Sequence, residues 1–306
     1  MPIPLPPLPP PPDWPSLYHA YGPATDTPSL LASLTPGPSD AWSALWGSIC
    51  HQGTVYPASF AALPLLASIA AGWAPRQRTE AVLLAAGIIR GLGDGDGDGD
   101  DGGEGERVWR EYGEWIWVFR ELAASCVGCF EGGYGGGEGE GDGEAEAEAD
   151  FVYLVQAMLV FEGSPGPWGE RLEGLAGGEM GEYLVVCPRC EAEVFCGGGG
   201  EDGRGFAARM DREMAREWGW GGIWPEEEGG EKEKEEEEEE DIPVVAVEED
   251  ELRRRGGVGW RVYEMAVHKG MKKLAGRVLY LCGRAECACG ERFVVGEAEE
   301  KFWNRY

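Results

Sequence analysis

Residues 179–196 read EMGEYLVVCPRCEAEVFC, and this stretch decides what the second half of the chain can be. A short apolar segment leads into the turn Cys187-Pro-Arg-Cys190, and an alternating segment follows, which predicts two strands joined by a metal knuckle. Two thiolates at this spacing can bind one side of an ion, but a structural zinc site needs four ligands at tetrahedral angles. The sequence therefore predicts a second pair of ligands elsewhere in the chain.

Cys287 and Cys289 are the candidates for that second pair, because they also lie beside a predicted turn and strand. Cys187, Cys190, Cys287 and Cys289 together would give four sulfur ligands for one structural Zn²⁺ in a closed site with no open position. The second pair has C-x-C spacing instead of C-x-x-C, so Cys196 and Cys282 stay open as substitute ligands.

The charge of the chain is concentrated in a few low-complexity tracts. The formal net charge is -30, and 27 of the 56 acidic residues lie in tracts 93–106, 131–150 and 226–241. Such tracts repel themselves and hold little apolar surface, so we expect disordered acidic loops around folded parts with a nearly balanced surface. Nucleic-acid binding through net charge is disfavoured, because phosphate affinity needs clustered Lys and Arg.

The cysteine content and the hydropathy pattern bear on the compartment. Nine cysteines without a secretory signal at the amino terminus predict reduced thiols, hence a cytoplasmic protein, with a nuclear location left open. Residues 41–75 carry no charged side chain, but Pro57, Pro64 and Gly72 interrupt the run. We therefore expect two packed helices there and no membrane span.

Residues 39–176 show a succession of helical patterns. They predict a helix through Trp42 and Ile49, one that starts at Pro57 and kinks at Pro64, and one after Pro75. Further helical stripes are Val108, Tyr112, Trp115, Phe119 and Leu122, then Phe151, Leu154, Val155, Met158 and Leu159, then Trp168, Leu172 and Leu175. Antiparallel helices with short joins suggest a stacked, HEAT-like layer.

The two ends of the chain differ from this layer. Residues 1–38 are predicted to form a Pro-rich disordered tail, whose polyproline II start could dock on SH3- or WW-type aromatic grooves or simply be an extended tail. Residues 177–306 are predicted to form a small α+β module with a disordered Glu-rich insertion at 226–241. Within it we expect a helix over 206–218, a buried strand over 242–247, and a helical stripe from Trp260 to Leu281 that breaks near Gly270.

A resemblance adds to this interpretation. The string HQGTVYPASFAALP (51–64), with FVYLVQAMLVFEG (151–163), GEYLVVCPRC (181–190) and LYLCGRAECACGERFVV (279–295), resembles uncharacterised, mostly bacterial HEAT-like helical-repeat proteins with a carboxyl-terminal zinc-ribbon-like module. The resemblance implies stacked helices and a bound zinc, and it implies no activity. The chain departs from the expected C-P-x-C-G pattern in the last knuckle, where Glu286 stands at the position of the first cysteine.

Three other patterns in the sequence are candidates for a metal or catalytic site. Cys126-x-x-Cys129 ends a predicted helix and has no second pair nearby, so buried apolar thiols are favoured over a metal. His51 beside Cys50 lacks an orienting acid, which disfavours a catalytic dyad. The run 94–105 matches part of a calcium loop but has Gly105 where the bidentate Glu belongs.

The sequence thus predicts a mainly α protein with a HEAT-like layer and a zinc-ribbon-like module. We expect a non-catalytic interaction or scaffold protein with an unidentified protein partner, stabilised by one structural zinc, and we have no expectation for its oligomeric state. One alternative is a thiol-disulfide oxidoreductase that uses Cys187 and Cys190. The other is a nucleic-acid-binding zinc ribbon.

Overall fold

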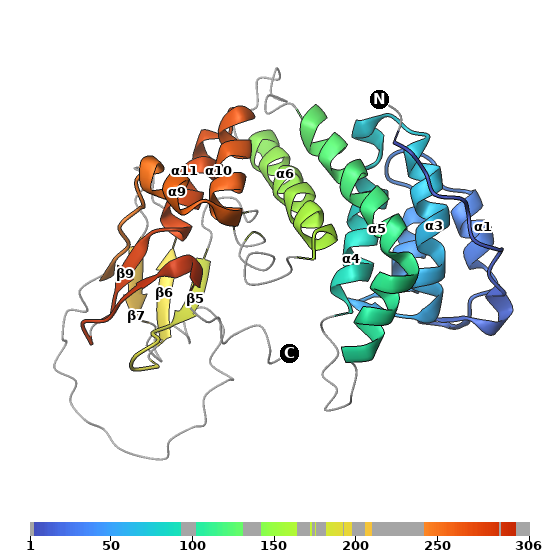
Figure 1. Ribbon diagram of the computed structural model, residues 1–306, viewed down its shortest axis with the longest axis horizontal. Coiled ribbons are helices and arrows are strands. Elements are labelled where there is room, and N and C mark those ends of the chain that lie inside the picture. Colours follow the sequence, from blue (N-terminus) through green and yellow to red (C-terminus); the bar gives the residue numbers. More distant parts are fainter. Residues whose placement is uncertain are drawn as a thin grey trace, which may run out of the picture. The chain divides into compact units, whose positions relative to one another are not determined.

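The chain folds into two compact units. The computed structural model describes residues 3–92, 102–130, 142–163, 172, 175, 182–191, 193–197, 206–209, 242–287 and 289–297. Unit 1 comprises Met1–Tyr134 and Asp150–Leu172, and unit 2 comprises Gly135–Ala149 and Glu173–Tyr306. Helices dominate the described residues, which confirms a mainly α protein (Figure 1).

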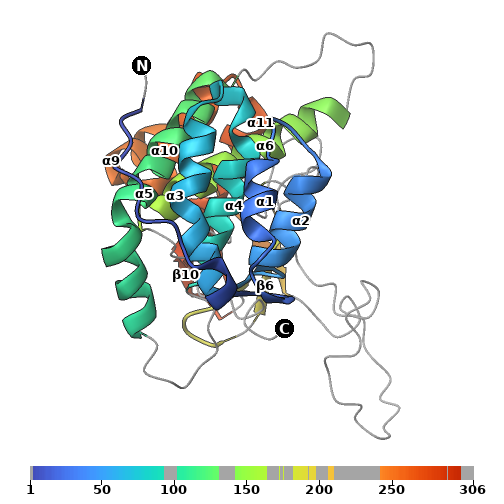
Figure 2. The ribbon, with the colours of Figure 1, turned by 90° about the vertical axis from the view of Figure 1, so that its right-hand side faces the viewer.

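Unit 1 is a group of helices that lie side by side (Figure 2). They are α1 (Thr27–Ala32), α2 (Asp40–Ile49), α3 (Pro57–Ala71), α4 (Thr79–Arg90) and α5 (Gly102–Cys129), with the second part of α6 (Asp142–Phe161). Helix α3 contacts α1, α4 and α5, so it lies at the centre of the group. Side-by-side helices fit the predicted layer, whereas the HEAT-like repeat type stays a prediction.

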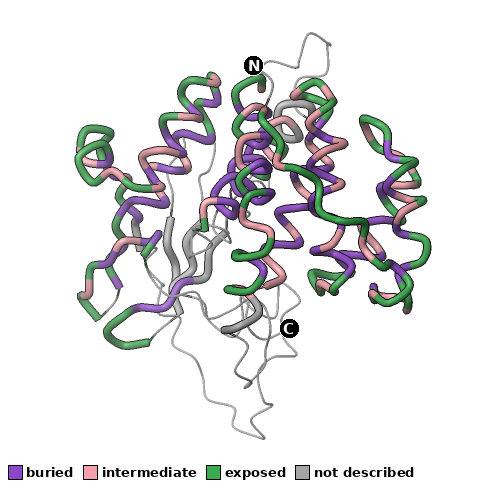
Figure 3. The backbone as a smooth tube through the Cα atoms, turned by 45° about the vertical axis from the view of Figure 1, so that its right-hand side comes forward, coloured by how far each residue is buried: buried purple, intermediate pink, exposed green. Residues whose placement is uncertain are grey.

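The predicted apolar stripes form the core of unit 1. On α5, Val108, Trp115, Phe119 and Leu122 are buried, as their spacing of three and four residues requires. Helix α3 buries residues on nearly all sides and continues through Pro64, and the predicted kink there stays a prediction. Figure 3 shows the buried residues as bands along the helices, which alternate with exposed turns.

Polar side chains satisfy the helix ends inside unit 1. The buried Ser59 hydroxyl donates to the carbonyl of Ile49 at 2.5 Å and accepts from the N–H of Tyr56 at 2.8 Å, so it links the end of α2 to the start of α3. At the other end of α3, the buried guanidinium of Arg78 donates to the carbonyls of Ala71 and Trp73. Free carbonyls at a helix end need such donors when water is excluded.

Short strands complete unit 1. Strands β3 (Cys50–His51) and β4 (Thr54–Val55) form a hairpin between the two helices that were predicted on either side of it. Its turn has φ of 51° at Gln52 and 80° at Gly53, and both values belong to the left-handed region that tight hairpin turns use.

The segment predicted as a tail over 1–38 is in large part folded. Trp14 and Leu31 are buried, and β1 (Tyr18–His19) pairs with β2 (Gly22–Pro23) ahead of α1. The 3₁₀ turn η1 (Trp14–Ser16) precedes β1. Proline-rich composition suggested a tail, but one buried indole and two buried leucines, Leu31 and Leu34, give this segment apolar surface to pack.

Unit 2 has three helices with described ends and two small sheets. The helices are α9 (Glu249–Arg255), α10 (Gly257–His268) and α11 (Lys272–Leu281). The predicted break near Gly270 is confirmed, since Gly270 has a φ of 73° between α10 and α11. Helix α9 was not predicted, because only Leu252 is buried on it and the sequence shows no apolar stripe.

The sheets of unit 2 differ partly from the prediction. The larger sheet has the order β5 (Glu182–Val186), β6 (Glu193–Gly197), β7 (Phe206–Arg209) and β8 (Ile242–Pro243), and all neighbours are antiparallel. The helix predicted over 206–218 is wrong for its first residues, which form β7, and the others lie outside the described residues. The strand predicted over 242–247 is only the short β8, followed by a single bridge between Val245 and Arg284.

The first part of α6 belongs to unit 2 and is fixed there by a buried carboxylate. Glu148 lies in the tract 131–150 that was predicted as a disordered loop, but α6 begins at Asp142. Its carboxylate accepts from the Arg277 guanidinium at 2.8 Å and from the N–H of Leu274 at 3.2 Å. Leu274 lies in the first turn of α11, which starts with two lysines, so Glu148 supplies the negative charge that this helix end lacks.

No helix in the part of the chain that the structure describes is both long and apolar enough to cross a membrane. The tracts at 93–101 and 226–241 lie outside the described residues.

Candidate metal centre

The first knuckle is the turn between β5 and β6. The last pair of this ladder is Val186 with Glu193, so Cys187 follows directly on the strand. The N–H of Glu191 donates to the carbonyl of Cys187 at 3.0 Å and closes the turn around the two cysteines. Glu191 has a φ of 59°, a left-handed conformation that glycine adopts without strain and other residues adopt at a cost.

The second knuckle is the turn between β9 (Arg284–Glu286) and β10 (Arg292–Val294). Glu286 pairs with Arg292 at the end of this ladder, and Cys287 follows at once. The N–H of Gly290, which has a φ of 81°, donates to the carbonyl of Cys287 at 2.7 Å. The loop is one residue tighter than the first, which lets C-x-C spacing present two sulfur atoms on the same side.

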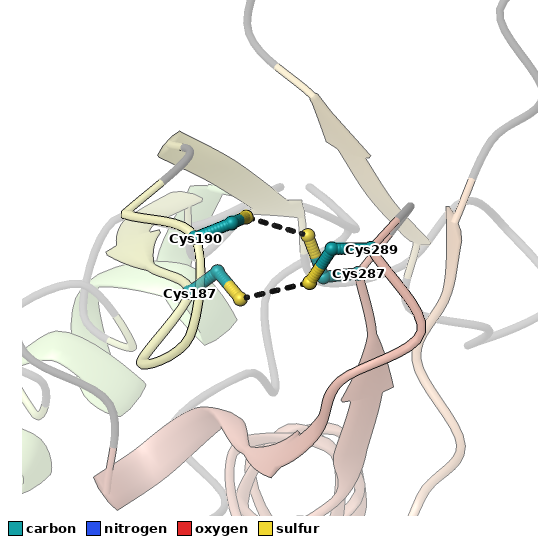
Figure 4. A group of neighbouring side chains, drawn as sticks. All are labelled: Cys187, Cys190, Cys287 and Cys289. Atoms are coloured by element: carbon teal, nitrogen blue, oxygen red, sulfur yellow. Dashed lines mark hydrogen bonds between the residues drawn. The ribbon is translucent and has the colours of Figure 1, made fainter.

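The two knuckles face each other, and their sulfur atoms converge (Figure 4). Two Sγ–Sγ distances, Cys187 to Cys289 and Cys190 to Cys287, are both 3.6 Å. All four sulfur atoms lie within 4.8 Å of one another. Zn–S bonds of about 2.3 Å at tetrahedral angles place sulfur atoms about 3.8 Å apart, so the spacing fits a tetrahedral ion. A disulfide would need about 2.05 Å.

Burial divides the four cysteines into two kinds. Cys187 and Cys287 are buried, whereas Cys190 and Cys289 are exposed. Each 3.6 Å pair therefore joins a buried sulfur of one knuckle to an exposed sulfur of the other. Among the residues that the structure describes, these four cysteines form the one group of His, Cys, Asp and Glu side chains close enough to share a metal ion.

The thiols of the cluster have perturbed pKa values. For Cys187, burial raises the pKa, but hydrogen bonds from the N–H groups of Cys190 and Arg189 and from neighbouring sulfur atoms outweigh it and lower the pKa to about 7. Burial raises the pKa of Cys287 to about 12, and contacts with the other sulfur atoms add to that rise. Neighbouring thiolates repel, so a metal-free cluster keeps some sulfur atoms protonated, whereas a dication favours all four thiolates.

The start of the second knuckle is held against Val245 by close backbone contacts. A Cβ on Gly283 would lie 2.4 Å from the carbonyl oxygen of Val245, so no larger residue fits there. Val245 and Arg284 exchange two backbone hydrogen bonds of 2.9 Å, and the N–H of Val295 donates to the carbonyl of Gly283 at 3.1 Å. A glycine directly before a predicted strand is a signal for such close backbone approach.

The rim of the site carries paired charges. Arg189 and Glu291, one from each knuckle, lie 4.0 Å apart, and Arg292 donates to Glu286 at 2.6 Å. Glu286 occupies the position where a regular knuckle has its first cysteine, and its side chain is bound to Arg292 on the surface of the hairpin. The displaced cysteine is Cys287, which lies within the cluster.

The other candidate ligands do not join the cluster. Cys282 is buried but is not a member of it, and the side chain of Cys196 lies outside the described residues. Cys126 donates its S–H to the carbonyl of Pro75 at 3.1 Å, and burial raises its pKa to about 11. Cys129 is exposed.

His51 and the calcium-loop pattern gain no support as sites. The ring of His51 stacks edge-on against Tyr21 with centroids 5.7 Å apart, and burial raises the pKa of the neighbouring Cys50. Most of the run 94–105 lies outside the described residues, and its last residues already belong to α5, which begins at Gly102.

Comparisons of the chain with protein-family models, with curated proteins and with solved structures find no match. The geometry of the site therefore carries the functional argument alone.

Proposed function

We propose that this chain is a non-catalytic protein-interaction or scaffold protein, and that one structural zinc ion holds unit 2 together. The observation that carries the proposal is the convergence of the four sulfur atoms of Cys187, Cys190, Cys287 and Cys289 within 4.8 Å. Four thiolates at tetrahedral spacing are the donor set that zinc prefers in closed sites. A closed site has no position for a substrate or a water molecule, so it stabilises a fold.

The free energy expected from zinc binding supports a structural role for the ion. The candidate ligands Cys190 and Cys287 are 97 positions apart in the chain. An ion bound by both would cross-link two distant segments and reduce the entropy of the unfolded chain. Structural zinc in zinc-finger peptides contributes about 10–16 kcal/mol, whereas whole domains are stable by only about 5–15 kcal/mol. Unit 2 should therefore depend on the ion for its fold.

The oxidoreductase alternative has less support. In thioredoxin-like motifs a helix follows the C-x-x-C turn, and its dipole favours the first thiolate. Here strand β6 follows Cys190, and the N–H groups of the turn, together with the other sulfur atoms, lower the pKa of Cys187. The lowered pKa of Cys187 is thus accounted for by the turn and by the neighbouring cysteines, without a helix dipole.

The nucleic-acid alternative also has less support, because acidic side chains partner the arginines around the site. Six arginines of unit 2 each lie within 4.0 Å of a carboxylate: Arg189, Arg253, Arg255, Arg277, Arg284 and Arg292. Phosphate binding needs cationic groups that are not already neutralised.

Metal content with matched variants tests the proposal. The purified chain is expected to carry one zinc per molecule, and Cys187→Ser is expected to lose it. Cys129→Ser changes a cysteine of the other C-x-x-C pair, so it should keep the metal. Disulfide-exchange turnover that depends on Cys187 in the zinc-loaded chain would contradict a non-catalytic role, and tight, salt-dependent RNA or DNA binding would favour the third function.

A further inference from the structure

The amino-terminal segment of unit 1 is an extended chain with a repeating pattern of exposure. Residues 3–12 read IPLPPLPPPP and form neither helix nor strand. Nearly every residue in the segment is a proline or precedes one, and both conditions restrict the backbone to the polyproline II region. A polyproline II helix has three residues per turn, so it presents three edges.

One edge faces the protein, and two edges face solvent. Ile3, Pro6 and Pro12 are half-buried, at intervals that are multiples of three, whereas Pro9 on the same edge is exposed. The other two edges are exposed along their whole length: Pro4, Pro7 and Pro10 on one, and Leu5, Leu8 and Pro11 on the other. Leu5 is 42% exposed and Leu8 is 52% exposed, which is uncommon for two neighbouring leucines on one edge of an ordered segment.

The segment is attached to unit 1 at its carboxyl end. Trp14 is only 8% exposed, and the N–H of Leu17 donates to its carbonyl at 3.1 Å. Further along, Nδ1 of the His19 ring accepts a hydrogen bond from the N–H of Tyr21. The neutral ring therefore carries its proton on Nε2, which lies 2.8 Å from a carboxylate oxygen of Asp26. These contacts fix the residues that directly follow the proline run, and the half-buried Ile3 and Pro6 lie against the protein, so a partner would have less of the segment to order.

We propose that residues 4–11 are a preformed polyproline II ligand for a protein groove lined with aromatic rings, of the kind found in WW domains. Proline rings stack on such grooves, and the carbonyl groups accept hydrogen bonds from ring N–H donors. The leucine edge fills the space between the rings. This inference rests on the proposed interaction role and names the chemistry of one partner.

The charge pattern selects among aromatic grooves. The first basic residue of the chain is Arg76, and Asp13 follows the proline run directly. A groove that requires a basic flanking residue, as an SH3 domain with an acidic pocket does, gains nothing from this ligand. A groove that uses only rings and a ring N–H matches it.

Titration of the full chain into a labelled WW domain that takes Pro-Pro-Leu-Pro ligands tests the inference by fluorescence polarisation. The chain is expected to bind, and the double variant Leu5→Ala/Leu8→Ala is expected to bind about tenfold more weakly or worse. Val267→Ala removes an equally exposed apolar side chain from unit 2 and should leave the affinity unchanged. A synthetic peptide of residues 2–13 should bind no more tightly than the full chain, because the folded protein preorders the ligand.

Several results would overturn the inference. Binding that survives the double leucine substitution would show that the exposed edge is not the ligand. Binding of the peptide without binding of the chain would show that the folded edge is inaccessible. Binding to an SH3 domain alone, or to neither domain, would refute the partner chemistry. Zinc content is measured on the same samples. A chain that carries zinc but does not bind the WW domain contradicts this inference alone, whereas a chain without zinc contradicts the proposed function.

Discussion

The Sγ atoms of Cys190 and Cys287 lie 3.6 Å apart, although the two residues are 97 positions apart in the chain. Two turns of different length produce this approach, since each is closed by a backbone hydrogen bond to its first cysteine and a left-handed residue follows its second. The C-x-C spacing is therefore a tighter version of the same knuckle. Because the two turns are equivalent, substitutions at their left-handed residues test the same backbone conformation twice.

Glu191 and Gly290 occupy corresponding left-handed positions, so exchanging their residue types should act in opposite directions. Gly290→Ala should destabilise the zinc-loaded chain by about 1–2 kcal/mol, because a Cβ is strained at a φ of 81°. Glu191→Gly should stabilise it by up to about 1 kcal/mol, since relief of strain at 59° is partly offset by the added entropy of the unfolded chain. Denaturant unfolding of both variants measures the difference. Equal effects of the same sign would show that the two turns are not equivalent.

The buried ion pair between Glu148 and Arg277 should be a strong support of unit 2. Its side chains are 7% and 14% exposed, so Glu148→Ala would leave a nearly buried guanidinium without its carboxylate and should cost about 3–5 kcal/mol. The exposed pair of Glu286 and Arg292 offers the control, since Glu286→Ala should cost no more than about 1 kcal/mol. Urea unfolding of the two variants compares them. Similar losses of unfolding free energy in the two variants would contradict the burial of the Glu148–Arg277 pair.

Thiol labelling should separate the cysteines by environment. At pH 8 a thiol with a pKa of about 11, such as Cys126, is ionised in only about one molecule in a thousand, so it should resist iodoacetamide. The exposed Cys129 should react at once, which provides an internal control.

The same labelling reports on the metal. Zinc should protect the exposed Cys190 and Cys289, and a chelator should make both reactive. Peptide mass spectrometry before and after chelation gives the readout. Rapid labelling of Cys190 in the zinc-loaded chain would argue against coordination.

Asp26 should make unit 1 sensitive to acid. Its hydrogen bond to His19 lowers the carboxyl pKa in the folded chain below the usual 3.8. A lowered folded-state pKa stabilises the fold above the unfolded pKa, and this contribution is lost as the pH falls through the folded value. Asp26→Asn should therefore destabilise the chain at pH 6 and have little effect at pH 2, by an amount limited by the exposure of the carboxylate.

Thermal unfolding at the two pH values measures the Asp26 effect. Asp13→Asn serves as the control, because the Asp13 side chain makes no capping hydrogen bond in the same segment. An effect of Asp26→Asn that is constant between pH 6 and pH 2 would contradict the role of the His19–Asp26 hydrogen bond.

Local patterns were the part of this structure that the sequence could predict. The apolar stripe on α5, the helix start at Pro57 and the break at Gly270 depend on residues within a few positions of one another. The two cysteine pairs were also predictable, because four ligands are a chemical requirement of the ion.

Long-range pairing explains what the sequence could not reveal. Glu148 belongs to an acidic, glycine-rich tract, and its burial becomes favourable through the N–H of Leu274 and the guanidinium of Arg277, which lie 126 and 129 positions away. Phe206 begins a strand because β6 offers it a free edge, whereas its own neighbours suggested a helix. Similarly, proline-rich composition hid the packing of Trp14. For Glu148 the deciding partners lie far along the chain, where periodicity carries no information.

The central claim is that four sulfur atoms from two knuckles bind one zinc ion. X-ray absorption spectroscopy of the purified full chain at the zinc edge tests it most directly. The structure predicts four sulfur neighbours at about 2.3 Å and no nitrogen or oxygen in the inner shell. An inner shell with nitrogen or oxygen, or with fewer than four sulfur atoms, would contradict the claim, as would a chain that binds no zinc when its cysteines are reduced.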